Sequence, residues 1–346
     1  MAELWDVIDP AELTGYSRAS LADRDENEFS LTRWFPNREL DDLVFEAQTG
    51  GGGLIDAANF RSYDSEPDFG SREGISSITG KLPPIARQML LSEYDQLRLR
   101  KAPEQAYRDL LLRDGERLTR QIDARLEIAR GDALVNGSVT LDERGVKATV
   151  AFSRKAEHSV TAATAWSNPA ADMITDLQTW SDVWSETNGA SPGAILTTKK
   201  VARAMLKNTG LQAQLYPGNS NLRLRRSDVD AWFEDNDLPP IQTYDAKVKW
   251  KGTERRILQE GRLLFLPAPA EVGSIDGGPV GETFWGTTAE AQEPQYGIQD
   301  GELPGIVVAA FKETKTPVHA ITIASAIGIP IMANPNASLV ANVGIS

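Results

Sequence analysis

The chain has 346 residues, of which 41% are hydrophobic and 25% charged, and a formal net charge of −13 at pH 7. It contains no cysteine, which excludes disulfides, thiolate catalysis and cysteine-ligated zinc. So acidic a chain is a poor candidate for gripping nucleic acid through a broad basic face, and no apolar run is long enough to cross a membrane.

Residues 1–53 mix charges with isolated aromatic residues and show no helical or strand period. Such a segment buries little by itself, so we expect Trp34 and Phe35 to be held by another part of the protein or by another copy. The acidic amino terminus does not have the pattern of a signal peptide. Four glycines at 50–53 predict a flexible join, and no Gly-Lys-Ser/Thr follows to make a phosphate-binding loop.

Residues 54–101 contain two polar, strand-like stretches, 57–63 and 75–79, around a turn-rich centre at 65–71. They predict a long two-stranded hairpin with little apolar face. An isolated hairpin of this kind is only marginally stable in water, and no other part of the chain offers an obvious surface for it. This is the first indication of assembly from several copies.

Residues 103–136 predict one long amphipathic helix, with Pro103 in its first turn and Asn136-Gly137 at its end. Its apolar residues recur at helical spacings: Tyr107, Leu111, Leu118, Ile122, Leu126, Ala129 and Ala133. At ~1.5 Å per residue the helix would span about 50 Å, longer than a compact domain usually needs. Gly115 indicates a bend or a close approach. Acid–base pairs at i,i+4 are expected at Glu104–Arg108, Asp109–Arg113 and Glu116–Arg120.

Beyond this helix the sequence predicts alternating strands and helices, and hence a compact α+β or α/β domain over about 160–300. A hairpin is expected at 138–152, followed by a helix from Asn168-Pro169 to Gly189 and a helix from 198 to 208 closed by Gly210. A further helix should open with a capping box at Ser227–Asp230. Strands are expected at 194–197, 247–250 and 262–266, with a Gly- and Pro-rich loop at 267–281.

The last forty or so residues are among the most apolar of the chain. Extended runs at 305–311, 317–331 and 337–343 are broken by Asn334-Pro335-Asn336. Because chain ends usually fray, an apolar end of this kind is expected to be tied into a sheet.

The sequence contains no catalytic motif. The two histidines, His158 and His319, lie far apart in the sequence. A calcium loop is resembled only faintly by Asp228, Asp230, Asp235 and Asp237, since a helix lies between them and the central Gly is missing. Spacing singles out no acid/base pair among the 49 acidic residues. We therefore predict no catalytic, cofactor-binding or metal-binding residues.

The order of these segments resembles the major capsid protein of tailed bacteriophages, specifically the lambda-like capsid protein E family. Three pieces carry the resemblance. Residues 103–136 read AYRDLLLRDGERL…ARGDALVNGSVTL and run into a strand; residues 165–189 resemble the opening of the family's second domain; and residues 318–343 place Pro330, Asn334 and Pro335 before a short final strand.

The resemblance implies an α+β fold of the Hong Kong 97 type, in four parts. Residues 1–53 would form an N-terminal arm and residues 54–101 an extended β-hairpin loop. Residues 102–160 and 305–346 would form a peripheral domain containing the long spine helix. Residues 161–304 would form the axial domain.

The resemblance also implies a function, that of a structural protein and not an enzyme. The chain would be a major capsid protein that self-assembles, as hexamers and pentamers, into the icosahedral shell around the double-stranded DNA of a tailed phage. It would reside in the virion after assembly in the host bacterial cytoplasm, and contact neither a membrane nor DNA of particular sequence. Expected partners are a portal, a decoration protein and a separate scaffolding protein, because about fifty residues before the loop leave little room for a scaffold segment. No Lys–Asn cross-link is predicted.

Two alternatives remain open at this point. One is an encapsulin-like shell of the same fold that stores a protein cargo instead of DNA. The other is a carboxylate-based hydrolase, which predicts a deep pocket with paired acids between residues 160 and 300 and a monomer or small oligomer.

Overall fold

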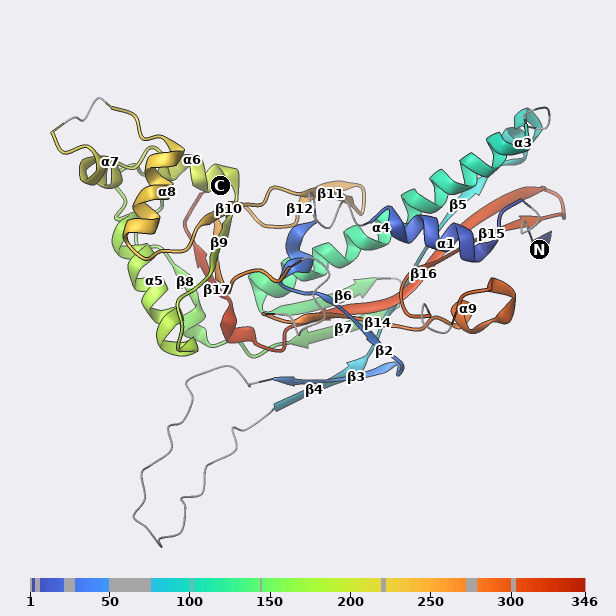
Figure 1. The fold of residues 1–346 in the computed structure, drawn as a ribbon, viewed down its shortest axis with the longest axis horizontal. Helices are drawn as coiled ribbons and strands as arrows, with labels where there is room; N and C mark the ends of the chain where they lie inside the picture. Colours follow the sequence, from blue (N-terminus) through green and yellow to red (C-terminus); the bar gives the residue numbers. More distant parts are fainter. Residues whose placement is uncertain are drawn as a thin grey trace, which may run out of the picture.

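The fold was analysed in a computed structural model (Figure 1), which describes residues 2–3, 7–21, 29–49, 76–99, 101, 103–143, 145–218, 222–271, 279–299 and 303–345. The molecule is elongated. A sheet with helices packed on it forms one end, a long helix runs through the middle, and a second sheet extends to the other end. Within the described ranges, no helix combines the length and hydropathy that a membrane span requires.

The long helix is α4 (Glu104–Asn136), with Pro103 at its N-cap and Gly137 ending it at a left-handed φ of 65°. The face predicted to be apolar is buried from Leu111 to Ala133, while Tyr107 is half-buried. The predicted helix and its buried face are therefore confirmed. Gly115 marks a close approach, since a Cβ there would lie 2.7 Å from Ser17 Oγ of α1 (Pro10–Ala19).

One of the three predicted i,i+4 ion pairs of α4 forms, Glu116–Arg120. Arg108 pairs instead with Glu12 of α1. Arg113 donates from Nε to the backbone carbonyl of Asp109, at 3.1 Å. The packing of α1 against the first half of α4, which the sequence did not indicate, takes the first pair away.

A six-stranded sheet lies under α4 and α1, which cover one of its faces. Its order is β1-β15-β16-β14-β2, with β5 also pairing with β16. The strands are β1 (Ala2–Glu3), β2 (Asn37–Leu40), β5 (Pro84–Leu91), β14 (Glu282–Gly286), β15 (Val307–Glu313) and β16 (His319–Ile331). The apolar strands predicted at 305–311 and 317–331 are thus the centre of this sheet. The strand β14 was missed because it follows a stretch rich in Gly and Pro.

A five-stranded sheet forms the other end, in the order β10-β9-β13-β17-β8. Its strands are β8 (Ser159–Thr161), β9 (Ala194–Thr197), β10 (Ile241–Thr243), β13 (Arg262–Leu266) and β17 (Leu339–Asn342). Helices α5 (Met173–Asn188), α6 (Lys199–Met205), α7 (Thr209–Leu215) and α8 (Arg226–Asp235) pack against it around Trp180, Trp184 and Trp232. The final strand of the chain therefore joins this sheet, whereas β15 and β16 lie with α4.

Three local predictions in this part were wrong. Helix α5 begins after Asp172, whose carboxylate accepts the Thr175 N–H, and Asn168 instead closes a turn by accepting the Ala170 N–H. Gly210 lies inside α7 and does not close α6. The cap of α8 is formed two residues earlier than predicted, at Arg225, because Asp228 accepts the backbone N–H of Arg225 at 2.9 Å.

Short hairpins complete the structure. β6 (Ser138–Glu143) and β7 (Val146–Ala151) form the hairpin predicted after the long helix, and β11 (Lys247–Trp250) pairs with β12 (Thr253–Arg256). The remaining elements are short: α3 (Glu93–Leu99), α9 (Ala289–Gln292), η1 (Ser30–Arg33), η2 (Ala156–His158), η3 (Pro294–Tyr296) and η5 (Pro335–Ala337).

The predicted long hairpin begins earlier than expected. β3 (Val44–Thr49) pairs with β4 (Ser76–Lys81), so its first described strand lies within the segment assigned to the arm. The overlooked signal in the sequence was the alternation of apolar Phe45 and Ala47 with polar Glu46 and Gln48. Phe45 and Ala47 are the buried residues of β3. The strand predicted at 57–63, its turn at 65–71 and the glycine run at 50–53 lie outside the described residues.

The aromatic residues of the arm are held within the same subunit. Trp34 and Phe35 are fully buried, and Trp34 donates from Nε1 to the carbonyl of Pro267 at 3.0 Å. The base of the hairpin also rests on its own chain, since the rings of Phe45 and Phe284 stack with centroids 6.0 Å apart. The expectation that no part of the same chain supports the hairpin was therefore wrong for its base.

Candidate functional site: a rigid frame and its assembly surfaces

The histidines and acids that the sequence analysis considered do not form a reactive centre. His158 of η2 lies 3.0 Å from Thr187 Oγ1 through Nε2, whereas His319 opens β16 and lies 2.8 Å from the carbonyl of Pro317. Asp228 accepts a hydrogen bond from the hydroxyl of Tyr216. In the part of the chain that the structure describes, no group of three or more His, Asp or Glu residues is arranged to hold a metal ion.

A buried ion pair lies in the second half of α4. Glu127 and Arg130 are 0% and 1% exposed, and Arg130 Nη1 donates to Glu127 Oε2 at 3.0 Å. The other carboxylate oxygen of Glu127 accepts the Leu31 N–H at 3.1 Å and the hydroxyl of Tyr244 at 2.5 Å. Burial, and then the charge of Glu127, raise the pKa of Tyr244 well above its usual value of 10.0. Tyr244 is therefore a neutral donor that helps to compensate the buried carboxylate.

The second half of this network runs into the six-stranded sheet. Arg130 donates from Nε to Thr283 Oγ1 at 3.0 Å and from Nη2 to Asn37 Oδ1 at 3.4 Å. The hydroxyl of Thr283 donates to the carbonyl of Phe35 at 3.0 Å, and Trp285 Nε1 donates to Asn37 Oδ1 at 2.9 Å. One pair of side chains on α4 thereby fixes the arm, the six-stranded sheet and the segment after β10 relative to one another.

The carboxyl end of α4 is fixed by a second cation. Arg154 donates from Nη1 to the carbonyl of Leu134 at 2.6 Å and from Nη2 to that of Val135 at 2.9 Å. It also reaches Ser338 Oγ at 3.4 Å, just before β17. Burial lowers the pKa of Arg154 to about 10, so the side chain remains charged at neutral pH. A cation here satisfies carbonyls that the helix leaves unpaired and complements its dipole.

A surface hollow lies beside the base of the β3–β4 hairpin. It has a volume of about 390 Å³ and is lined by Arg38, Glu46, Ala47, Glu282, Phe284, Ile331 and Ala333. Arg38 pairs with Glu282 at 2.8 Å and lies 5.6 Å from the Phe284 ring centroid. Arg38 of β2 and Glu46 of β3 lie outside the 160–300 segment in which the hydrolase alternative expects its pocket, whereas Glu282 of β14 lies inside it. The charge of Glu282 is compensated by Arg38, so one of the two acids that line the hollow is already paired with a cation.

The arrangement as a whole is an elongated frame whose parts are joined by the buried contacts of Glu127, Arg130 and Arg154. The sequence predicted no catalytic, cofactor-binding or metal-binding residue, so there is no predicted site residue whose position the structure could test. The buried network was missed because Glu127 and Arg130, three residues apart on a charged helix, resemble an ordinary exposed pair. The signal that could have found them is the continuation of the apolar face on both sides, which places both on the buried side of α4.

Comparison with known proteins agrees with this description. The sequence matches the family model of phage major capsid protein E over residues 43–337. A prophage capsid protein of Escherichia coli CFT073 has a similar structure, with a TM-score of 0.65 and 14% identity over 97% of this chain and 99% of that one. A phage-related protein of Bordetella bronchiseptica RB50 is similar with a TM-score of 0.58 and 14% identity, over 96% of each chain. No curated protein matches the sequence significantly.

At 14% identity the structural neighbours establish the fold alone, and that fold is the α+β capsid fold of the Hong Kong 97 type predicted from the sequence. The family model covers most of the chain and describes structural shell proteins, which removes the hydrolase alternative. The chain belongs to the phage major capsid protein E family.

Proposed function

We propose that this shell-forming capsid protein builds the icosahedral head of a tailed phage, in hexamers and pentamers, around a double-stranded DNA genome. The observation that carries the proposal is the family match over residues 43–337. It is supported by the shape of the subunit, whose stiff α4 frame carries two sheets at opposite ends. Closed shells arise when identical rigid subunits repeat the same contacts around symmetry axes.

We propose four working parts for the subunit: the arm at 1–53, the extended loop at 54–101, a peripheral domain at 102–160 and 305–346, and an axial domain at 161–304. The pairing of β15 with β16, both of which contact α4, supports the peripheral grouping. Strand β17 connects the two domains, because it lies in the tail of the chain but pairs with β13 and β8.

We propose that the enclosed DNA is held without sequence-specific contacts. A formal net charge of −13 favours a container that does not adhere to a polyanion. The further partners in this proposal are a separate scaffolding protein, a portal and a decoration protein, with assembly in the cytoplasm of the host bacterium. These partners and this place of assembly are expected from the role of the family.

The test is the content of purified particles. The chain should be produced together with the genes that flank its own, and the particles treated with nuclease and then opened. Protected double-stranded DNA is the expected result. Particles that instead copurify with one stoichiometric protein and no DNA would support the encapsulin-like alternative and overturn the proposal of a phage head.

A further inference from the structure

A group of large apolar side chains is exposed where β5 runs into α3 (Glu93–Leu99). Leu90 is 63% exposed, Tyr94 68% and Leu97 55%, and the guanidinium carbon of Arg98 lies 5.8 Å from the Tyr94 ring centroid. All seven residues of α3 are described, and none of them is buried. Helices this short are not stable alone in water and depend on packing. The group therefore has the character of a surface that a partner covers.

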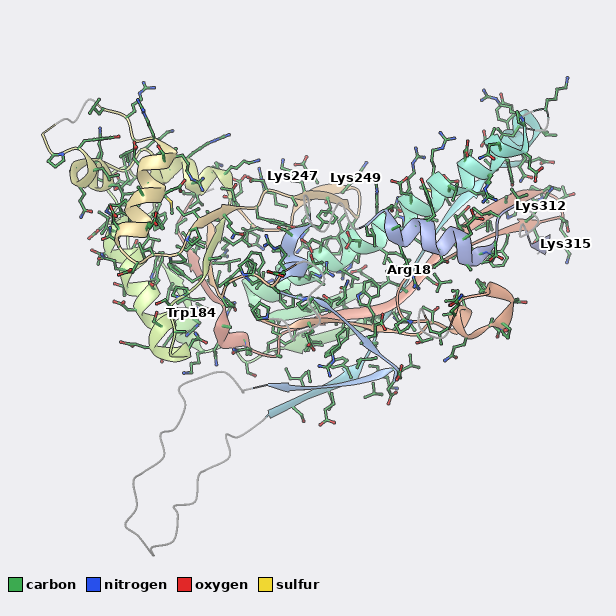
Figure 2. All side chains as sticks on the ribbon, viewed as in Figure 1. Arg18, Trp184, Lys247, Lys249, Lys312 and Lys315 are labelled. Carbon is green, nitrogen blue, oxygen red and sulfur yellow. The ribbon has the colours of Figure 1, made fainter. Side chains whose placement is uncertain are left out.

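The rim of this surface is largely basic. Arg98 and Lys101 are exposed beside the apolar group, and Figure 2 shows Lys312 and Lys315 at the same end of the molecule. Two acids lie in the first turn of α3: Glu93 is exposed, and the half-buried Asp95 accepts the hydroxyl of Ser92 at 2.7 Å. We use the name tip patch for Leu90, Tyr94, Leu97, Arg98 and Lys101.

A second exposed apolar group lies at the turn between β2 and β3. Leu43 is 54% exposed and Val44 48%, and Glu39 and Asp41 are exposed next to them. The turn is built locally, since Asp42 Oδ1 accepts the Val44 N–H at 3.2 Å. We use the name corner patch for Glu39, Asp41, Leu43 and Val44. It is apolar at its centre, and its rim carries the exposed acids Glu39, Asp41 and Asp42 together with the exposed Lys81, which lies opposite Val44 on β4. The acids outnumber this base, so the rim has the opposite net charge to the tip patch.

We propose that the corner patch of one copy docks on the tip patch of a second copy. Apolar side chains would then cover apolar side chains, and the acids Glu39 and Asp41 would meet the bases Arg98 and Lys101. Charge complementarity of this kind sets the orientation of a contact and excludes wrong partners. The partner is a second copy because this inference rests on the proposed function, in which each subunit is surrounded by identical ones.

The two patches lie on separate parts of the subunit: α3 at the outer end, and the β2–β3 turn beside the hairpin base (Figure 1). A contact between different patches of identical subunits is heterologous, so a docked pair still has one free tip patch on one copy and one free corner patch on the other, and further copies can be added. Such a contact closes into a ring when the rotation between copies allows it. This is the kind of contact that a capsomer requires.

The absence of cysteine from the sequence makes the contact directly testable. Leu43→Cys and Tyr94→Cys would be made as separate single variants, each with one thiol. The two would be mixed during assembly and treated with a bis-maleimide, which joins two nearby thiols. Leu222→Cys, at a leucine 49% exposed outside both patches, is the matched control partner.

The expected result is a cross-linked dimer of the Leu43→Cys and Tyr94→Cys chains, and no comparable product with the control. Particles that form without the mixed dimer would overturn the contact and leave the proposed function standing. A mixed dimer in the absence of any particle would support the contact and count against the shell. Neither particle nor dimer would contradict both.

Charge reversal gives an independent test. Glu39→Lys with Asp41→Lys, and Arg98→Glu with Lys101→Glu, should each abolish particles while leaving the melting temperature of the subunit unchanged. Asp42 stays in place because it holds the turn. Combining all four changes restores opposite charges and should restore particles. The proposal would be overturned if a variant with only one patch reversed assembled like the wild type. It would also be overturned if the variant with both patches reversed folded and did not assemble.

Discussion

The hydroxyl of Tyr244 lies 2.5 Å from Glu127 Oε1, so the segment after β10 donates a hydrogen bond to the second half of the spine helix, α4. This contact joins the segment beside the five-stranded sheet to α4 through a carboxylate that is fully buried. A buried charge is costly unless every lone pair is satisfied, so the arrangement holds these elements in one relative position. For a subunit that repeats in a shell, such rigidity lets each contact be reproduced from copy to copy.

The first prediction concerns the buried ion pair. Arg130→Met removes the cation and leaves the Glu127 carboxylate partly uncompensated, which should lower the free energy of unfolding by about 3–5 kcal/mol. Arg120→Met removes a partner of the more exposed pair with Glu116 and should cost about 0–1 kcal/mol. Guanidinium unfolding of both variants measures the difference. Equal losses would show that the buried network does not stabilise the frame.

The second prediction concerns the end of α4. Arg154→Ala leaves the carbonyls of Leu134 and Val135 without their charged donor, which should cost about 1–3 kcal/mol. Arg113→Ala is the control, because its guanidinium donates to one carbonyl within an exposed turn of the same helix. Thermal melting would separate the two. A control that melts as low as Arg154→Ala would contradict the capping role.

The third prediction compares two glycines. Gly115→Ala places a Cβ 2.7 Å from Ser17 Oγ and 3.0 Å from Leu13 Cδ1, so α1 must shift and the subunit should lose about 1–3 kcal/mol. Gly15→Ala, within α1, meets no atom within 4 Å and should gain about 0.5–1 kcal/mol from helix propensity. Opposite signs in equilibrium unfolding are expected. A gain at both positions would show that α1 does not approach α4 closely.

The fourth prediction is a pH dependence at His158. Burial, and then the nearby charges of Lys155 and Arg154, hold the pKa of His158 below its usual 6.5, against the opposing effects of Ser338 and Glu157. The unfolded chain therefore binds a proton at a higher pH than the folded chain does. The stabilisation is present above about pH 6.5 and is lost as the pH falls from there towards the folded pKa.

The check is the melting temperature of the wild type and of His158→Gln across this range, with the other titrating groups common to both. The wild type should lose more stability on acidification than the variant. Parallel curves would show that His158 has the same proton affinity in the folded and unfolded states.

The sequence predicted the fold class and the long helix well, because a continuous apolar face from Leu111 to Ala133 has one simple solution. It placed element ends less well. Asn168-Pro169 has the chemistry of a helix start, yet Asp172 takes that role four residues later. Local signals of equal strength competed there, and packing of Met173 and Leu177 into the core decided between them.

The surfaces were harder to predict than the frame. The exposure of Leu90 and Tyr94 follows from the position of β5 at the side of β16, a long-range pairing that no local pattern reveals. The burial of Trp34 likewise depends on Pro267, far away in the sequence. The resemblance to a capsid family supplied the expectation of assembly. The residues of the tip and corner patches could be identified only from their exposure in the structure.

The most direct test of the central claim is electron microscopy of the chain produced with the genes that flank its own, alongside size-exclusion chromatography. The account predicts closed icosahedral shells of uniform size, built from rings of this subunit. A chain that is folded, expressed with those partners and still elutes as a monodisperse monomer with no rings or shells would contradict it.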